Sequence, residues 1–514
     1  MAPNLIKRGL YSRYVVEWIP FLLHRYTLDV FLPTPVNYIT NMTIDSKTKS
    51  HIFQKKIADK GLVCIGSKND GMYIILEDSA TGEKTVALDG ISGAAVCSLG
   101  HNDPEITSQF SKWASEYPYT FGAYYGNDPA EQLGKFMCDR SKGAFESCLW
   151  TQSGSEATEN AIKIMRQYHL EKGDDKRYKV ISRLQSYHGF TLGALSVGDG
   201  TRKPPFKKIL LSDDQTPKMA QLYPYRDWKA GWTEEEYTKW LLDQAEQTFI
   251  DNDPSTVAGV IVETVGGSTI GTPTPPKGYL DGLKAICHKY GALFMLDEVM
   301  CGLGRCGYDF TYMHPEFGLT TGGPDILSVG KTIGSGLVTL AGLFFSPDVC
   351  RAFNEGSGYI MGAQTYHSHA FTCRVGLAVQ QKIVRDNLVE NVRIVGAYTK
   401  EQLKEQLKDC KIVGDVRGAG NFLSIELVKN RETKEYFDPK LALGPTMHKK
   451  IYEKGVIVMG ASGTVGYKYH GLNDVTCYGD HITMGPAFGT TKEQADIIIK
   501  AVVEALYEME KEVL

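Results

Sequence analysis

Short apolar runs alternate with helix-length amphipathic stretches through the middle of the chain. The runs predict strands at Ser147–Thr151, Lys179–Ser182, Ala258–Glu263, Ala292–Asp297, Ile326–Val329 and Ala341–Phe345. Helical patterns lie between several of them, for example Glu156–Leu170 and Tyr279–Tyr290. This alternation favours a mostly parallel sheet with helices on both faces. Ligands of such sheets bind beyond the carboxyl ends of the strands, so the polar residues that end these runs are candidates for a site.

The two ends of the chain have a different pattern. Val63–Asp89 alternates short apolar runs with turn residues, which predicts an antiparallel meander. Near the other end, Glu390–Lys408 predicts a long helix, Ile412–Val416 and Phe422–Val428 predict a strand pair, and Thr491–Glu510 predicts a closing helix. We therefore expect an α/β fold with a large parallel-sheet domain and a smaller α+β domain.

The pattern also suggests boundaries. We expect an N-terminal extension at residues 1–50 and the N-terminal part of the small domain at 51–105. The large domain would cover 106–385, and the small domain would be completed by 386–514. A length of 514 residues is consistent with two or three domains.

Composition and charge exclude several classes of protein. A net charge of −4 without a basic stripe argues against nucleic-acid binding. Eleven scattered cysteines without a CxxC pair argue against a zinc site or a disulfide framework and favour a reducing, cytoplasmic location. The N-terminal region has no apolar run long enough to span a membrane. Its basic residues weakly resemble a mitochondrial presequence, but serine is scarce, so we prefer an irregular extension.

Gly154 and Ser155 stand where a predicted strand turns into a predicted helix. Free backbone N–H groups and the helix dipole would make this turn an anion site. An ordinary capped helix, with Ser153 or Ser155 as the N-cap, explains the same residues.

Two predicted strands end in carboxylates, Glu263 and Asp297. Such an acid can simply face water. Asp297, however, follows a strongly apolar run, and a buried carboxylate needs a cationic or hydrogen-bonding partner. A protonated heterocyclic nitrogen is one such partner.

Lys331 follows another apolar strand, in the triplet Gly330-Lys331-Thr332. A phosphate-binding loop of the form GxxxxGK[ST] would need glycine where Asp325 stands, so this interpretation fails on spacing. A surface lysine is one alternative. A desolvated lysine suits Schiff-base chemistry, because burial lowers its pKa and frees the amine.

These residues together suit a phosphate-bearing aldehyde cofactor. The anion-binding turn, the buried Asp297 and Lys331 come from separate strand ends. Tyr187, next to His188, adds an aromatic ring that could stack on the cofactor.

The chain resembles the class III aminotransferases, the group that contains 4-aminobutyrate, ornithine and omega-amino-acid:pyruvate transaminases, over roughly residues 51–510. The motifs that carry the resemblance stand in family order: Leu99-Gly100-His101, Ser153-Gly154-Ser155-Glu156-Ala157, Tyr187-His188-Gly189-Phe190-Thr191, Leu296-Asp297-Glu298-Val299 with Gly302-Leu303-Gly304-Arg305, Gly330-Lys331 and Val416-Arg417-Gly418. The Asp-Glu-Val segment, the Gly-x-Gly-Arg segment and the later lysine are together highly specific.

The resemblance implies a fold-type I, pyridoxal 5'-phosphate-dependent enzyme. Lys331 would carry the cofactor as a Schiff base and later move a proton, and Asp297 would keep the pyridine nitrogen protonated. Val299 and Tyr187 would pack on opposite faces of the ring, with His188 in the same cofactor-binding set.

The resemblance also implies roles at the edges of the site. Gly154 and Ser155 would bind the phosphate, and Glu263 would lie near the cofactor hydroxyl. Thr365 would reach the phosphate of a neighbouring subunit, which implies a homodimer with shared active sites, and Arg417 would grip a substrate carboxylate.

Three departures from the family pattern fall around the site: Thr264 where proline is usual, Cys306 where threonine is usual, and Ser368-His369-Ala370 where Gly-His-Pro is often found. None removes a required chemical group, but substrate preference cannot be carried over. The pair His367 and His369 could suggest a metal site; the family histidine at 369 favours a structural role, and we predict no metal.

We therefore expect an aminotransferase that moves an amino group from an amine or amino acid to a keto acid or aldehyde. A decarboxylase, racemase or aminomutase on the same fold is the alternative, because the sequence does not show which bond of the substrate is labile. A catalytically inactive paralogue would be expected to lack the lysine or the aspartate, and both Lys331 and Asp297 are present.

Overall fold

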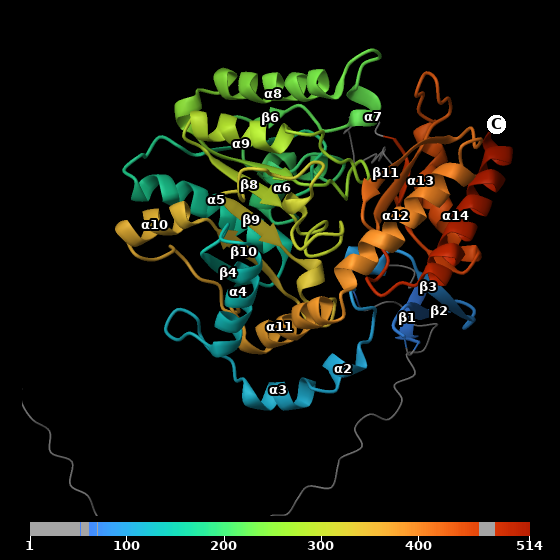
Figure 1. Cartoon of the computed structure of the whole chain (residues 1–514), viewed down its shortest axis with the longest axis horizontal. Helices are drawn as coiled ribbons and strands as arrows, with labels where there is room; N and C mark the ends of the chain where they lie inside the picture. Colours follow the sequence, from blue (N-terminus) through green and yellow to red (C-terminus); the bar gives the residue numbers. More distant parts are fainter. Residues whose placement is uncertain (1–51, 53–60, 69, 462–478) are drawn as a thin grey trace, which may run out of the picture. The chain divides into compact units, whose positions relative to one another are not determined.

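The computed structural model describes residues 52, 61–68, 70–461 and 479–514 (Figure 1). Contacts divide the chain into Met1–Ala58 and Asp59–Leu514, and the description below concerns the second unit. The predicted extension at 1–50, with its possible presequence, lies outside the described residues.

A seven-stranded sheet forms the centre of this unit, in the order β4-β10-β9-β8-β7-β5-β6. β10 runs antiparallel to both β4 and β9, and the other neighbours are parallel. The strands are β4 (Ser147–Thr151), β5 (Lys179–Arg183), β6 (Lys218–Met219), β7 (Val257–Glu263), β8 (Leu293–Asp297), β9 (Ile326–Val329) and β10 (Ala341–Phe345). All the strands predicted for the middle of the chain are confirmed. β6 was not predicted, because two residues show no periodicity.

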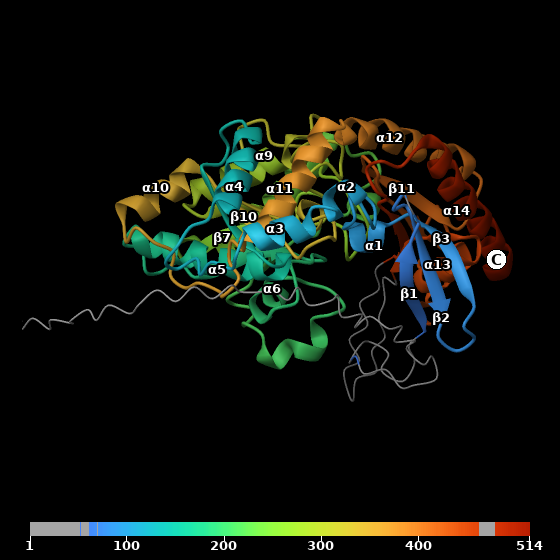
Figure 2. The ribbon, with the colours of Figure 1, turned by 90° about the horizontal axis from the view of Figure 1, so that it is seen from below.

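Each face of the central sheet packs on its own layer of helices (Figures 1 and 2). Leu293 and Met295 of β8 join the apolar cluster on the side of α5 and α10, whereas Phe294 and Leu296 join the cluster on the side of α4, α8, α9 and α11. Burial on both faces explains why the strands are continuous apolar runs. These helices are α4 (Asp128–Arg140), α5 (Gly154–Glu171), α8 (Glu234–Asp251), α9 (Tyr279–Lys289), α10 (Pro347–Glu355) and α11 (Ala370–Arg385).

Two smaller sheets are formed by the parts of the chain that come before and after the central sheet in sequence. The predicted meander forms β1 (Leu62–Ser67), β2 (Tyr73–Asp78) and β3 (Lys84–Asp89), and β13 (Val456–Ile457) joins it parallel to β3. The second sheet has the order β11-β12-β15-β14, with β11 (Val413–Ala419), β12 (Phe422–Leu427), β14 (Met459–Ala461) and β15 (His481–Met484). Strands from the N-terminal and C-terminal parts of the chain thus share a sheet.

Three long helices cover these smaller sheets: α12 (Leu388–Gln406), α13 (Leu443–Glu453) and α14 (Lys492–Val513). The α/β architecture with a smaller α+β part is therefore confirmed, while the boundaries at residues 50, 105 and 385 stay predictions. The remaining α-helices are α1 (Ser92–Ala95), α2 (Pro104–Thr107), α3 (Phe110–Glu116), α6 (Leu192–Val197) and α7 (Pro224–Asp227). The 3-10 helices are η1 (Pro204–Ile209), η2 (Pro254–Thr256), η3 (Thr311–Met313), η4 (Lys331–Ile333) and η5 (Pro439–Leu441). No helix within the described ranges has the length and apolar character needed to cross a bilayer.

The strand register brings three polar residues into one row. Glu263 at the end of β7 pairs with Asp297 at the end of β8, and Asp297 pairs with Ser328 of β9. Lys331 follows three residues after Ser328. The carboxyl edge of the sheet therefore assembles the side chains on which the site depends.

Candidate active site

A cavity of about 500 Å³ lies at the carboxyl ends of the central strands. Its walls include most of the residues that the sequence singles out, namely Gly154, Ser155, Tyr187, His188, Glu263, Asp297, Val299 and Lys331. Val96, Gln152, Ser268, Met300 and the loop 336–340 complete much of the lining. The structure thus brings residues from five strand ends around one space. Thr365 and Arg417 are not among its walls.

Asp297 is 5% exposed and has three hydrogen-bond donors. His188 Nδ1 lies 2.8 Å from one carboxylate oxygen, while the Val299 amide and the Ser328 hydroxyl each donate to the other at 3.0 Å. Donors of this kind stabilise the ionised form of a buried carboxylate. Asp297 therefore supplies a fixed negative charge at the cavity wall, as its place after an apolar strand predicts.

Lys331 presents its amine to the same cavity. Burial lowers the pKa of Lys331 from 10.5 to about 8; the charge of Arg305 also lowers it, while Asp297 opposes the shift. No hydrogen bond or ion pair reaches Lys331 Nζ from the residues that the structure describes. The backbone of Lys331 has a φ of +46°, in the left-handed region that side chains other than glycine rarely adopt. Such strain concentrates at functional sites, and here it accompanies an amine that is readily deprotonated.

The turn at Gly154 begins α5. Ser153 is the N-cap, and its hydroxyl accepts a hydrogen bond from the Glu156 amide at 3.2 Å. The first amides of the helix, at Gly154 and Ser155, have no earlier turn to donate to and lie at the cavity. A Cβ atom at Gly154 would lie 2.7 Å from Val299 Cγ1, so only glycine allows this close approach. The sequence allows either a helix cap or an anion site at this turn. The structure is compatible with both, because Ser153 caps the helix while the amides of Gly154 and Ser155 lie at the cavity.

Tyr187 and Glu263 form another wall of the cavity. The Tyr187 amide donates to Glu263 Oε2 at 3.2 Å, and the Gly267 amide donates to Oε1 at 3.3 Å. Burial raises the pKa of Glu263. Arg202 lies 4.7 Å from the centre of the Tyr187 ring, so a guanidinium covers one part of this aromatic side chain.

Thr365 is exposed, and its carbonyl accepts a hydrogen bond from the Tyr119 hydroxyl at 3.0 Å. Nearby, His367 Nε2 lies 2.9 Å from Glu156 Oε1 in the first turn of α5. The contact ties the 364–369 loop to the anion-binding turn. The role of Thr365 toward a second subunit stays a prediction.

Arg417 is buried and does not line the cavity; its two terminal guanidinium nitrogens have partners elsewhere, while its Nε has none among the described residues. Its guanidinium lies 2.7 Å from Glu426, which is itself 0% exposed, and 3.1 Å from Asp415. It also donates to the Ile270 carbonyl. A substrate carboxylate would have to compete with these partners, so its proposed role as a substrate clamp stays a prediction.

The sequence does not predict the contacts of two further residues of the site, Ser328 and Thr264. Ser328 lies inside a strand, and only the register places its hydroxyl on Asp297. Thr264, the first departure from the family pattern, donates from its amide to the Asp297 carbonyl at 3.2 Å and from its hydroxyl to Glu298 at 3.0 Å. Proline, the usual residue, could make neither bond. Thr264 thus ties the end of β7 to the residues that follow β8.

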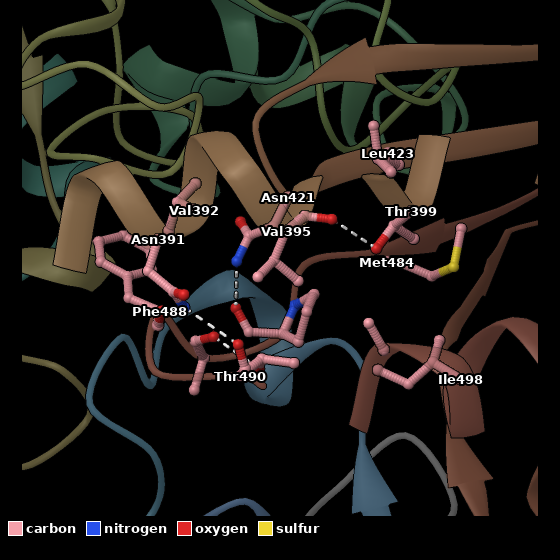
Figure 3. A pocket seen from close by; sticks show the side chains of 13 residues that line it. Asn391, Val392, Val395, Thr399, Asn421, Leu423, Met484, Phe488, Thr490 and Ile498 are labelled. Atoms are coloured by element: carbon pink, nitrogen blue, oxygen red, sulfur yellow. Dashed lines mark hydrogen bonds between the residues drawn. The ribbon is translucent and has the colours of Figure 1, made fainter. Parts of the chain in front are cut away.

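A second cavity, between α12, β12 and α14, is unsuited to a substrate (Figure 3). Its volume is about 20 Å³, room for roughly one water molecule. Figure 3 shows its amides turned to the backbone: Asn421 Nδ2 donates to the Pro486 carbonyl at 2.9 Å and Asn391 Nδ2 to the Thr490 carbonyl at 3.0 Å. The polar groups are satisfied internally, so this is a small packing void.

Comparison with known proteins gives a consistent result. The family model described as aminotransferase class-III matches residues 55–506. An uncharacterized aminotransferase of Schizosaccharomyces pombe is 34% identical over 85% of this chain and 91% of its own length. A diaminobutyrate–2-oxoglutarate transaminase of Halomonas elongata is 30% identical over 80% of this chain and 84% of its own length. The solved (S)-enantioselective omega-transaminase from Thermomicrobium roseum superposes with a TM-score of 0.78 at 28% identity, covering 90% of this chain and 97% of that one.

Proposed function

Because the chain belongs to the class III aminotransferase family, we propose that the cavity beyond β7, β8 and β9 binds pyridoxal 5'-phosphate, with Lys331 as the residue that holds it covalently. Members of this family transfer amino groups with that cofactor, and the chain is a transaminase. One observation carries the assignment to this cavity. A readily deprotonated lysine and a carboxylate with three donors occur together at the same wall.

The described residues fit the parts of this cofactor. The amides that begin α5 offer donors to a phosphate, and Asp297 offers a fixed negative charge to a protonated ring nitrogen. His188 Nε2 is buried and has no hydrogen-bond partner among the described residues, which leaves a donor or acceptor for a bound molecule beside Asp297. Val299 and Tyr187 supply an aliphatic and an aromatic surface for a flat ring.

The mechanism assigns one task to each group. When bound, pyridoxal phosphate supplies an electron sink for the bond broken at the donor's α-carbon. Asp297 would hold a proton on the ring nitrogen of the bound cofactor, and its hydrogen bond with His188 fixes the orientation of the Asp297 carboxylate. Lys331 Nζ removes the proton from the α-carbon of the amine donor and later returns a proton. Because Lys331 is held at the cavity wall, this transfer is effectively intramolecular.

Thr365 supports a further element of the proposal, a homodimer in which each subunit completes the other's site. Thr365 is exposed and does not line the cavity of its own chain. Exposed aromatic residues lie near it: the Tyr119 hydroxyl donates to the Thr365 carbonyl, and the Tyr119 and Tyr366 rings are 6.0 Å apart. Phe121, Tyr124 and Tyr125 follow on the same segment as Tyr119 and are also exposed. Apolar patches of this kind mark association surfaces. Sedimentation analysis tests this: a dimer supports it and a monomer at assay concentrations contradicts it. The cytoplasmic location stays a prediction.

Half-reactions with a panel of amines and keto acids test the activity directly. An amine donor should convert the cofactor to its aminated form, seen as loss of its visible absorbance, and a keto acid should restore that absorbance. Turnover that needs no acceptor, with release of carbon dioxide or loss of chirality, would instead indicate a decarboxylase or racemase.

A further inference from the structure

Cys97, His101 and Asp89 form a connected row outside the walls of the cofactor cavity. Cys97 Sγ lies 3.6 Å from His101 Nδ1, and His101 Nε2 lies 2.6 Å from Asp89 Oδ2. A carboxylate can only accept, so Nε2 donates to Asp89 and Nδ1 is left to receive the thiol proton. A nucleophile, a base and a group that orients the base therefore lie next to one another in space, in that order.

The carboxylate at the end of this row is held in place. Asp89 is 5% exposed, and it also accepts the amides of Ile91 at 3.0 Å and Gly93 at 2.8 Å. The hydrogen bond that His101 donates to Asp89, and then its hydrogen bond with Cys97, raise the pKa of His101 to about 10. His101 is thus protonated near neutral pH, and a positive charge beside a thiol favours the thiolate form.

A second positively charged side chain, Arg305, interacts electrostatically with the thiol. Arg305 is 0% exposed and has no ion pair among the described residues; it donates to Gly485 at 2.7 Å, to the Pro486 carbonyl and to Asn421 at 3.4 Å. Burial lowers the pKa of Arg305 to about 10, and Cys97 is among the groups whose charge opposes that shift. Cationic neighbours favour a thiolate over a thiol.

The thiol lies against the wall of the cofactor cavity. Cys97 is half-buried, and its neighbour Val96 lines the cavity. A Cβ atom at Gly336 would lie 2.9 Å from Cys97 Sγ, and Gly336 also lines the cavity, on the loop that follows Lys331. A group attached to Cys97 Sγ would therefore press on this loop.

We propose that Cys97, with His101 as its base and Asp89 as the orienting partner, is a reactive thiol that soft carbon electrophiles of the α,β-unsaturated carbonyl class modify, and that the adduct disturbs the adjoining cavity. The thiolate attacks the β-carbon and forms the S–C bond. The C=C electron pair moves to the α-carbon, which takes up the proton that His101 received from Cys97. The addition is balanced and needs no oxidant. None of the three residues lines the cavity that is proposed for transamination.

Peptide mapping of the holoenzyme after brief treatment with limiting N-ethylmaleimide tests the reactivity. Cys64 is the internal control, because it is exposed and, among the described residues, its Sγ has one hydrogen-bond partner, the Gly66 carbonyl at 3.6 Å. An ordinary thiol is a few per cent ionised near neutral pH, so a Cys97 activated by the His101–Asp89 pair should react about tenfold faster than Cys64 despite its lower exposure. If Asp89 and His101 only stabilise the turn that follows β3, Cys97 will react no faster than Cys64, and this result would overturn the proposal.

Two variants sharpen the test. His101→Gln should slow the labelling of Cys97 about tenfold and leave that of Cys64 unchanged; equal Cys97 rates in both proteins would overturn the role of His101. The wild-type comparison of the two cysteines stands even if this variant folds poorly. Cys97→Ser should transaminate normally and resist the reagent, while the wild type loses activity in step with labelling at Cys97. Full labelling without loss of activity would overturn the effect on the cavity. The label is read by mass, so this result is independent of the proposed cofactor site.

Discussion

His188 donates from Nδ1 to Oδ2 of Asp297 across 2.8 Å, and the two side chains belong to segments 109 residues apart in sequence. The Ser328 hydroxyl and the Val299 amide occupy the other carboxylate oxygen. Asp297 is therefore fixed in both orientation and charge before any ligand binds. An active site benefits from such pre-organisation because no reorganisation is needed during the reaction.

Asp297→Asn should retain some cofactor and lose roughly 100-fold or more in kcat, because the amide cannot balance a protonated ring nitrogen. Single-turnover rates with an amine donor measure the effect. Ser328→Ala is the matched control, because it removes one hydrogen bond to Asp297 and keeps the charge. Ser328→Ala should lower kcat much less than Asp297→Asn does. Equal losses of kcat in the two variants would show that the charge of Asp297 is not what it contributes.

The attachment of cofactor to the apoenzyme should depend on pH near the pKa of Lys331, which burial lowers to about 8. The amine loses its proton as pH rises through that value, and only the neutral amine reacts with an aldehyde. The attachment rate should therefore rise with pH and level off above about pH 8. Borohydride trapping at timed intervals measures it. In Asp297→Asn the midpoint should fall, because Asp297 raises the pKa of Lys331; a midpoint near that of an unperturbed lysine would contradict the buried amine.

Gly154→Ala should disturb Val299, since the new methyl would lie 2.7 Å from Val299 Cγ1. Overpacking of this kind costs about 1–3 kcal/mol, so the free energy of unfolding of the apoenzyme should fall by that amount. Val299→Ala makes room for the methyl group. The double variant should therefore be more stable than the sum of the two single changes predicts, and strict additivity would show that the two residues are not in contact.

Thr264→Val should destabilise the protein, because it removes a hydroxyl that donates to the buried Glu298 carboxylate. The expected loss is about 1–3 kcal/mol in the free energy of unfolding. Thr248→Val is a suitable control, because the Thr248 hydroxyl donates only to the Gln244 carbonyl of its own helix. It should change stability by less than about 0.5 kcal/mol. A similar effect of both substitutions would argue that Thr264 has no special part in joining β7 to β8.

The sequence predicts the central sheet well, because strands buried on both faces are continuous apolar runs between turn residues. It also predicts which polar residues end those strands, and most of them line the cavity. It does not predict the partners of those residues. Ser328 contacts Asp297 only because β8 and β9 pair in one register, and register is a property of the folded sheet.

Arg417 is a second residue whose contacts the sequence does not predict. A family motif marks this residue, but the motif does not contain Glu426, which lies nine positions later and contacts Arg417 diagonally across the β11–β12 pair. β6 is missed for a different reason, since two residues are too short to show periodicity. The row of Cys97, His101 and Asp89 likewise depends on the turn after β3, which brings together side chains from 89 to 101.

The most direct test of the account is the substitution Lys331→Ala in the purified protein. Without this amine the cofactor has no covalent attachment and the donor's α-proton has no nearby base, so the visible absorbance of the attached cofactor and nearly all transamination should be lost. Circular dichroism would establish that the variant is folded. A folded Lys331→Ala protein that keeps both the absorbance and the activity would contradict the assignment of Lys331.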